Sequence, residues 1–165
     1  MKLKIRPMDE VDIPRVLELM TRTHQLNTTG RLMEREELQQ IFCDTAASTR
    51  IIVAELEDMF GGYGCIGTAM VQNNGHTSRL IYLAVSCRVM GRGIERSILA
   101  WIARRGQQDG KRWLEAEFRD TGKNRIMRAL YLMEGLRNEK EDAGTFLFRG
   151  ECARIPDAPT WVEVV

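Results

Sequence analysis

Arginines and glycines gather in one short segment, in a pattern suited to holding a phosphorylated ligand. The segment reads Arg88-x-x-Gly91-x-Gly93 and lies between a β-branched run and an amphipathic run. Glycines let the backbone approach a ligand without a Cβ clash, and the first amides of a following helix can bind an anion. The pattern therefore predicts a pyrophosphate site made by Arg88, Val89, Met90, Gly91, Arg92, Gly93 and Ile94.

Cys87 directly precedes this arginine and is a candidate nucleophile. Positive charge from Arg88, Arg92 and the helix start would favour its thiolate, which can take an acyl group from one thioester and pass it to another. The competing interpretation is a small apolar residue packed at a strand end.

Two further groups of polar residues are candidates for a role at an acceptor. Glu117 shares a strand face with Glu115, so it either acts through water as a base for an amine or merely faces solvent. A loop carries Asn27, Thr28 and Thr29, which either line an acceptor pocket or cap the next helix.

The elements that position these residues alternate between strand and helix patterns. Helices are expected to begin near residues 12, 33, 93 and 124, with glycine-containing turns at 60–64 and 73–75. Three successive strands joined by turns predict an antiparallel meander, so the fold class is α+β with a mixed sheet rather than a run of βαβ units. Strands are expected over residues 2–7, 50–56, 65–71, 79–85, 113–118, 145–149 and 161–165.

Length and composition exclude several classes of protein. A chain of 165 residues suits one domain, and 24 basic against 23 acidic residues leave a net charge of +1, which argues against a bulk nucleic-acid binder. The positive charge is local, with seven basic and two acidic residues from Arg88 to Arg112. Four cysteines without a CxxC pair, together with only two histidines, predict no metal site, and the chain has no apolar membrane segment. We expect a cytoplasmic protein with reduced thiols.

Two motifs resemble those of the GNAT superfamily of acyl-CoA-dependent N-acyltransferases. The first is the Arg88-x-x-Gly91-x-Gly93 loop, and the second is Asn124-x-x-Met127-x-x-Leu130-Tyr131, similar to Asn-x-x-Ala-x-x-Leu-Tyr, with Met127 where a small residue is usual. The resemblance implies that Asn124 orients the cofactor or substrate and that Tyr131 protonates the departing thiolate. A helix tyrosine packed with its tip in water is the alternative for Tyr131.

The same resemblance implies a fold and a cofactor position. One GNAT-like domain over residues 1–165 would have a mixed, mostly antiparallel sheet flanked by helices on both faces. The pantetheine arm of the thioester would lie where the fourth and fifth strands splay apart, bound by backbone groups of Ile81 and Leu83.

A longer set of sequence segments is similar to the C-terminal GNAT-like domain of FkbH-like proteins, which load glyceryl units in polyketide assembly. Its most specific part is SCRVMGRGIE, residues 86–95, and the likeness spans residues 3–136. The N-terminal phosphatase-type domain of those proteins has no counterpart here, so no phosphate-removing step is carried over.

These features predict an acyltransferase that moves an acyl group from CoA, or from a phosphopantetheine-linked thioester on an acyl carrier protein, in polyketide-type metabolism. Alternatives are a non-catalytic carrier-protein docking module and a small-amine N-acetyltransferase. The oligomeric state is open, because the two C-terminal strands could complete the sheet in one chain or across a dimer.

Overall fold

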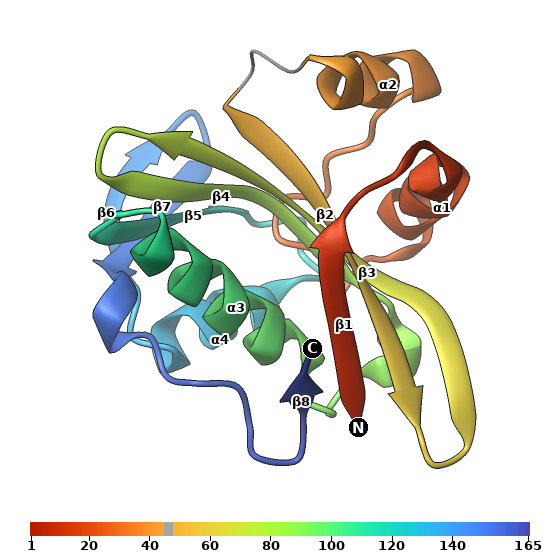
Figure 1. The fold of residues 1–165 in the computed structure, drawn as a ribbon. Coiled ribbons are helices and arrows are strands. Elements are labelled where there is room, and N and C mark those ends of the chain that lie inside the picture. The colour runs from red at the N-terminus through yellow and green to blue at the C-terminus, as the bar shows by residue number, and fades with distance from the viewer. Residues whose placement is uncertain (45–47) are drawn as a thin grey trace.

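A single eight-stranded sheet organises the chain, with helices on both faces (Figure 1). The structure is a computed structural model that describes residues 1–44 and 48–165. The strands are β1 (Lys2–Pro7), β2 (Thr49–Asp58), β3 (Gly61–Asn74), β4 (Thr77–Val85), β5 (Trp113–Arg119), β6 (Arg137–Asp142), β7 (Thr145–Glu151) and β8 (Glu163–Val164). The helices are α1 (Ile13–Arg22), α2 (Arg35–Cys43), α3 (Ile94–Gln108) and α4 (Arg125–Met133), with short 3-10 turns at Glu10–Asp12, Cys87–Val89 and Cys152–Arg154.

The sheet is mixed and mostly antiparallel, as predicted. Its strand order is β6-β7-β5-β4-β3-β2-β1-β8, and only the β4–β5 and β1–β8 pairs are parallel. The C-terminal strands β7 and β8 pair with β5 and β1 of the same chain, so they complete the sheet internally. The α+β fold class is therefore confirmed.

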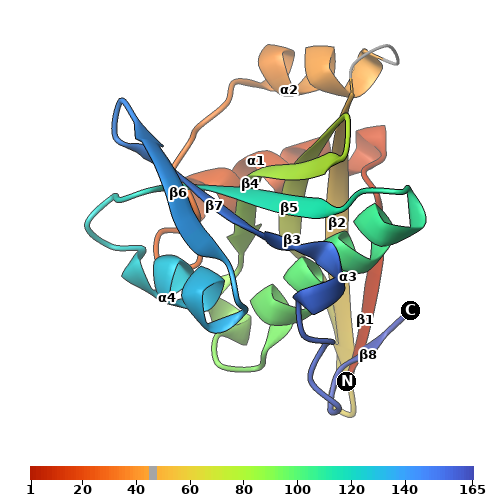
Figure 2. The ribbon, with the colours of Figure 1, turned by 90° about the vertical axis from the view of Figure 1, so that its left-hand side faces the viewer.

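Two apolar cores lie on opposite faces of the sheet. One is built against α3 and α4 and includes Ile98, Leu99 and Tyr131, while the other lies under α1 and α2 and includes Val16 and Leu38. Figure 2 shows α1 and α2 on one side of the strands and α3 and α4 on the other. The apolar stripes of these helices fix the sheet between them, which holds the ends of β4 and β5 in place.

Two predictions about elements are wrong in detail. The segment 60–64 is not a turn, because β3 begins at Gly61 and the turn is at Met59–Phe60, where Asp58 accepts a hydrogen bond from the Phe60 amide (2.8 Å). Gly61 and Gly64 have φ of 121° and 65°, and β3 is irregular there against β2. The edge strand β6 was not predicted, because all six of its residues are exposed and it carries no apolar alternation.

Candidate active site

The central strands β4 and β5 separate at one end, as the resemblance implied. Their parallel pairing ends at Leu80 and Ala116, while β4 continues to Val85 and β5 to Arg119. The ends of the two strands therefore leave a wedge between them, which we call the splay.

The splay is filled by the loop between α1 and α2. Thr28 donates its amide to the Leu83 carbonyl (2.9 Å), and its hydroxyl accepts from the Leu83 amide (3.0 Å). On the other side, the Thr28 carbonyl accepts from the Arg119 amide (2.9 Å), so the loop bridges β4 and β5 like a short inserted strand. Both backbone polar groups of Leu83 are thus bonded to Thr28, so the expected contact of Leu83 with pantetheine would require this loop to move. Ile81, the other expected partner, is partly exposed just beyond the last β4–β5 pair.

The residues predicted to line an acceptor pocket are part of this inserted loop. Asn27 and Thr28 are 1% and 0% exposed, and only Thr29 is partly accessible. The Asn27 side chain donates to the Tyr82 hydroxyl (3.0 Å) and accepts from the amides of Thr29 and Gly30. The hydrogen bonds of these residues stabilise the loop, and the buried side chains do not line an open pocket.

The side chain of Asn124 binds the inserted loop through hydrogen bonds. Its side-chain amide donates to the carbonyls of Asn27 (2.8 Å), Arg119 (2.8 Å) and Thr28 (3.3 Å), and it is fully buried. The side-chain oxygen accepts from the Thr121 amide (3.0 Å). Every polar atom of this side chain is thus engaged inside the protein, which leaves none for the predicted cofactor contact.

Tyr131 points at the splay from α4 but is covered. Its hydroxyl donates to the Glu117 carbonyl (3.2 Å) and is hydrogen-bonded to the Thr28 side chain, with no exposed surface. Burial raises the pKa of this phenol well above its usual range. The side chain also packs on Phe148, with ring centroids 5.5 Å apart. A packed tyrosine is the interpretation that this geometry favours.

Glu117 lies on the opposite face of β5 from this core. Its carboxylate is 2.9 Å from the Arg79 guanidinium, so the side chain is part of a partly exposed ion pair on the sheet. Glu117 and Tyr131 meet only through the Glu117 main chain. The structure therefore does not bring the predicted base and the predicted acid together.

The arginine–glycine loop folds as a 3-10 turn followed by the start of α3. Gly91 and Gly93 have φ of 77° and 79°, conformations that glycine adopts without strain. The amides of Val89, Met90 and Arg92 are bonded within the turn to carbonyls of the same loop. The side chains of Val89 and Ile94 are buried in the core.

The charge of this loop is largely compensated inside the chain. Arg92 pairs with Asp58 (2.8 Å) and lies over the Tyr63 ring, and Arg96 pairs with the buried Glu134 (2.9 Å). Arg88 donates to the Ser86 hydroxyl (3.4 Å) and interacts electrostatically with the Glu18 carboxylate, whose pKa it helps to lower, but it forms no ion pair within 4 Å with any described residue. Among the three arginines of this segment, Arg88 is therefore the one whose charge is not paired with a carboxylate.

The start of α3 carries an acidic residue of its own and is covered by the C-terminal segment. The Glu95 carboxylate accepts a hydrogen bond from its own amide, in the first turn of the helix. The C-terminal segment covers Gly93, since a Cβ there would come within 3.0 Å of Pro159, and Trp161 donates its indole N–H to the Arg92 carbonyl (3.0 Å). Sequence reasoning missed this second contact, because nothing local links a C-terminal tryptophan to a loop 69 residues earlier.

The buried Glu95 carboxyl predicts a dependence of stability on pH. Burial raises its pKa, and one of its oxygens has no hydrogen-bond partner among the described residues. Such a group contributes most below its unfolded pKa of about 4.3, and that stability is lost as pH rises through the raised folded value. We therefore expect Glu95→Gln to raise the melting temperature at pH 8, with a difference that shrinks toward pH 4.

Thermal unfolding across this pH range measures the effect of Glu95→Gln. The matched control is Glu141→Gln on the exposed strand β6, whose side chain forms no ion pair with a described residue, so the melting temperature should stay nearly unchanged at each pH. A difference that does not vary with pH would contradict the assignment.

Cys87 differs from the other cysteines in being both exposed and next to the loop. Cys43 is the other exposed thiol, on α2, whereas Cys65 is partly buried and Cys152 is buried. Cys87 begins the 3-10 turn, and the preceding Ser86 caps that turn by accepting from the Arg88 amide. The alternative of a buried, packed Cys87 is therefore wrong.

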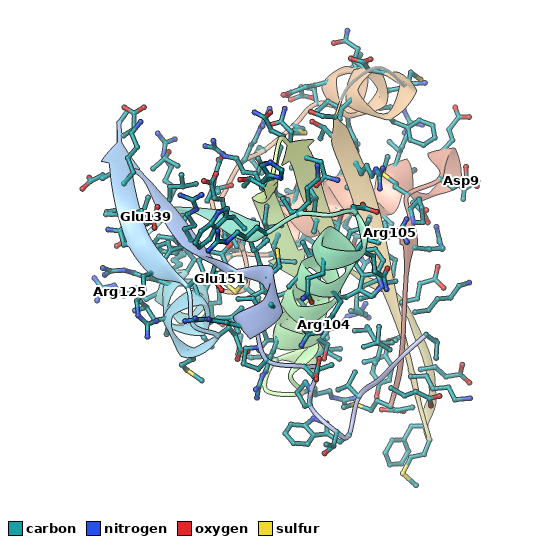
Figure 3. The ribbon with its side chains drawn as sticks, turned by 60° about the vertical axis from the view of Figure 1, so that its left-hand side comes forward. Asp9, Arg104, Arg105, Arg125, Glu139 and Glu151 are labelled. Atoms are coloured by element: carbon teal, nitrogen blue, oxygen red, sulfur yellow. The ribbon has the colours of Figure 1, made fainter. Side chains whose placement is uncertain are left out.

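Cavities do not coincide with the predicted catalytic residues. A small cavity of about 170 Å³ is lined by Met90, Gln25 and residues 122, 123, 125 and 126 at the start of α4. A larger one of about 810 Å³ lies among α2, β2, β3 and α3, and none of the predicted site residues lines it. Figure 3 shows Arg125 at the outer edge of α4, pointing away from the sheet.

No group of three or more His, Cys, Asp or Glu side chains is arranged to hold a metal ion within residues 1–44 and 48–165. In the same ranges, no helix is long and apolar enough to cross a membrane.

Solved structures place this architecture in a known fold. The ribosomal-protein-S18-alanine N-acetyltransferase from Escherichia coli superposes with a TM-score of 0.70 at 15% identity, over 96% of this chain and 97% of that one. The PaiA N-acetyltransferase from Thermoplasma acidophilum, solved with coenzyme A, gives 0.73 at 14% identity over 92% and 99%. The chain has the GNAT fold.

A putative GNAT acetyltransferase from Desulfovibrio desulfuricans gives a TM-score of 0.70 at 20% identity, over 91% of this chain and 99% of that one. No family model and no curated protein matches the sequence. The narrower likeness to FkbH-like domains gains no support from these comparisons.

The residues of this GNAT fold do not fit a pantetheine arm in the splay. The backbone groups of Leu83 are bonded to Thr28, and the start of α3 holds Glu95 and is covered by the C-terminal segment.

Proposed function

We propose that this chain is an acyltransferase that carries the acyl group on Cys87. The observation that carries the proposal is the contrast between two candidates: Cys87 is exposed beside the unpaired Arg88, while Tyr131 is fully buried under Thr28. A nucleophile must reach its substrate, and Cys87 alone of the two meets that requirement. The GNAT fold supports acyl transfer as the reaction class.

The reaction would proceed by two thioester exchanges. The Cys87 thiol loses its proton to solvent, and the thiolate attacks the acyl carbonyl of the donor. The donor C–S bond breaks, and the released donor thiolate takes up a proton. An acceptor thiolate then attacks the Cys87 thioester, which forms the product thioester and restores the Cys87 thiolate.

The donor proposed is an acyl thioester, either of CoA or of a phosphopantetheine arm on an acyl carrier protein. Arg88, Lys123 and Arg125 are exposed and form no ion pair with any described residue. Their charge would attract an acidic donor and speed its association. A place in polyketide-type metabolism, with a glyceryl unit as the acyl group, is proposed on the resemblance of the sequence segments to FkbH-like domains alone.

A small-amine N-acetyltransferase is the second candidate, because structural neighbours include N-acetyltransferases. In that reaction the amine attacks the donor directly, and Tyr131 would protonate the leaving thiolate. The third candidate, a carrier-protein docking module without turnover, is favoured by the filled splay. The three candidates differ in product: a new thioester, an amide, or neither.

Product analysis separates them. The chain is incubated with acetyl-CoA or a glyceryl-loaded carrier protein, together with either a small thiol or a small amine, and products are identified by mass spectrometry. Thioester formation above the rate without protein supports the proposal. Amide formation favours the second candidate, and no product with either acceptor favours the docking module.

Tyr131→Phe is expected to leave thioester exchange within about twofold of the native rate, since the phenol is covered. The variant removes both hydrogen bonds of the phenol, to the Glu117 carbonyl and to the Thr28 side chain, so the free energy of unfolding should fall by about 1–3 kcal/mol. Steady-state exchange kinetics and urea unfolding measure the two effects. A loss of exchange of about a hundredfold or more with native stability would return Tyr131 to a catalytic role.

A further inference from the structure

The segment Leu26–Thr28, which we call the plug, takes the place of a ligand in the splay. Its hydrogen bonds to β4 repeat those of a strand: the Val85 amide donates to the Leu26 carbonyl (2.9 Å), and Thr28 exchanges two bonds with Leu83. Asn27 forms an antiparallel bridge with Ala84. An extended ligand laid along this edge of β4 would need the same backbone groups.

The plug is also bonded to β5 and to α4. The Arg119 amide donates to the Thr28 carbonyl, and Asn124 donates to the carbonyls of Asn27 and Thr28. All three plug residues are at most 1% exposed. The plug is thus fixed on three sides and closes the wedge down to Tyr131, whose hydroxyl bonds to the Thr28 side chain.

The second half of a CoA site is closed by different parts of the chain. At the start of α3, the Glu95 carboxylate holds its own amide, and a negative charge there opposes a phosphate. Pro159 and Trp161 lie against Gly93 and Arg92, and Asp58 neutralises the Arg92 side chain. These contacts crowd the start of α3 and offset the charge of Arg92, which opposes binding of a pyrophosphate there.

We propose that this chain does not hold CoA between β4 and β5, because the plug serves as a permanent internal strand there. Displacing it would break at least five buried hydrogen bonds, which would weaken an apparent affinity by about 10³-fold or more. An acyl donor then reaches the chain from outside the splay. The inference goes beyond the Cys87 proposal and does not depend on it.

The test is an amide NMR titration of the ¹⁵N-labelled full chain with CoA, with pantetheine and with adenosine 3′,5′-bisphosphate. The reporters are four backbone amides. Those of Leu83, Val85 and Arg119 donate hydrogen bonds to the plug, and that of Thr28 belongs to the plug. The PaiA enzyme, whose solved structure contains coenzyme A, is the positive control for the ligand stock. We expect the reporters to stay unshifted by all three ligands up to millimolar concentration.

Saturable shifts of these reporters, with a dissociation constant in the micromolar range for CoA, would overturn the inference. Shifts confined to residues elsewhere, such as Lys123 and Arg125, would support it, because they would place binding outside the splay. Acylation of Cys87 is read separately by mass. A chain without acylation and with unshifted reporters refutes the proposed function and leaves this inference standing.

Discussion

Replacing Cys87 by alanine is expected to lower thioester exchange by at least about 10³-fold, because the variant lacks the atom that carries the acyl group. The side chain is exposed at the start of a short 3-10 turn, so its removal should leave the fold intact. The rate of acyl transfer from acetyl-CoA or an acyl-carrier thioester to a small thiol measures the effect. Circular dichroism and melting temperature establish that the variant is folded.

Cys43→Ala is the matched control for this experiment. Cys43 is the other exposed thiol and lies on α2, so it reports acylation that needs only accessibility. We expect Cys43→Ala to exchange thioesters at the native rate. Equal losses in both variants would mean non-specific thiol chemistry, and a native rate in Cys87→Ala would refute the relay.

Asn124→Ala is expected to lower the free energy of unfolding by about 2–4 kcal/mol, the largest change in stability that the site predicts. The substitution removes a donor from three carbonyls, those of Asn27, Thr28 and Arg119, of which the Thr28 carbonyl keeps a second donor, the Arg119 amide. These carbonyls belong to the plug and to the end of β5, so the loss falls on the contacts that keep the splay closed. Urea unfolding measures the change.

Two further variants test whether the effect of Asn124→Ala comes from its donated hydrogen bonds. Lys123→Ala changes an exposed neighbour with no bonded side chain and should stay within about 0.5 kcal/mol of the native chain. Asn124→Asp keeps the acceptor for the Thr121 amide but cannot donate to the carbonyls, so it should destabilise as much as alanine. Native stability in Asn124→Ala, together with lost transfer, would return Asn124 to a role in binding.

Much of the fold could be predicted from local patterns. The helix α3 begins at Ile94, where the glycine loop ends, and α4 begins directly after Asn124. Short β-branched and apolar runs bounded by turn residues predicted β2 to β5, and their buried residues pack in the two cores. The edge strand β6 carries no such alternation, so only its pairing with β7 defines it.

The closed state of the site could not be predicted in the same way. Thr28 and Leu83 are 55 residues apart, and their hydrogen bonds depend on where α1 and the sheet place the loop, not on a local pattern. The residue type of a buried Asn or Thr does not reveal whether its side chain binds a ligand or another part of the chain. The acidic Glu95 was the one local sign that phosphate fits poorly at α3.

The most direct test of the central claim is intact-protein mass spectrometry after incubation with acetyl-CoA and, separately, with a glyceryl-loaded carrier protein. We predict one acyl adduct per chain from at least one donor, present in the native chain and in Cys43→Ala and absent from Cys87→Ala. Peptide mapping would place it on Cys87. No adduct from either donor, or an adduct that persists in Cys87→Ala, would contradict the proposal that Cys87 carries the acyl group.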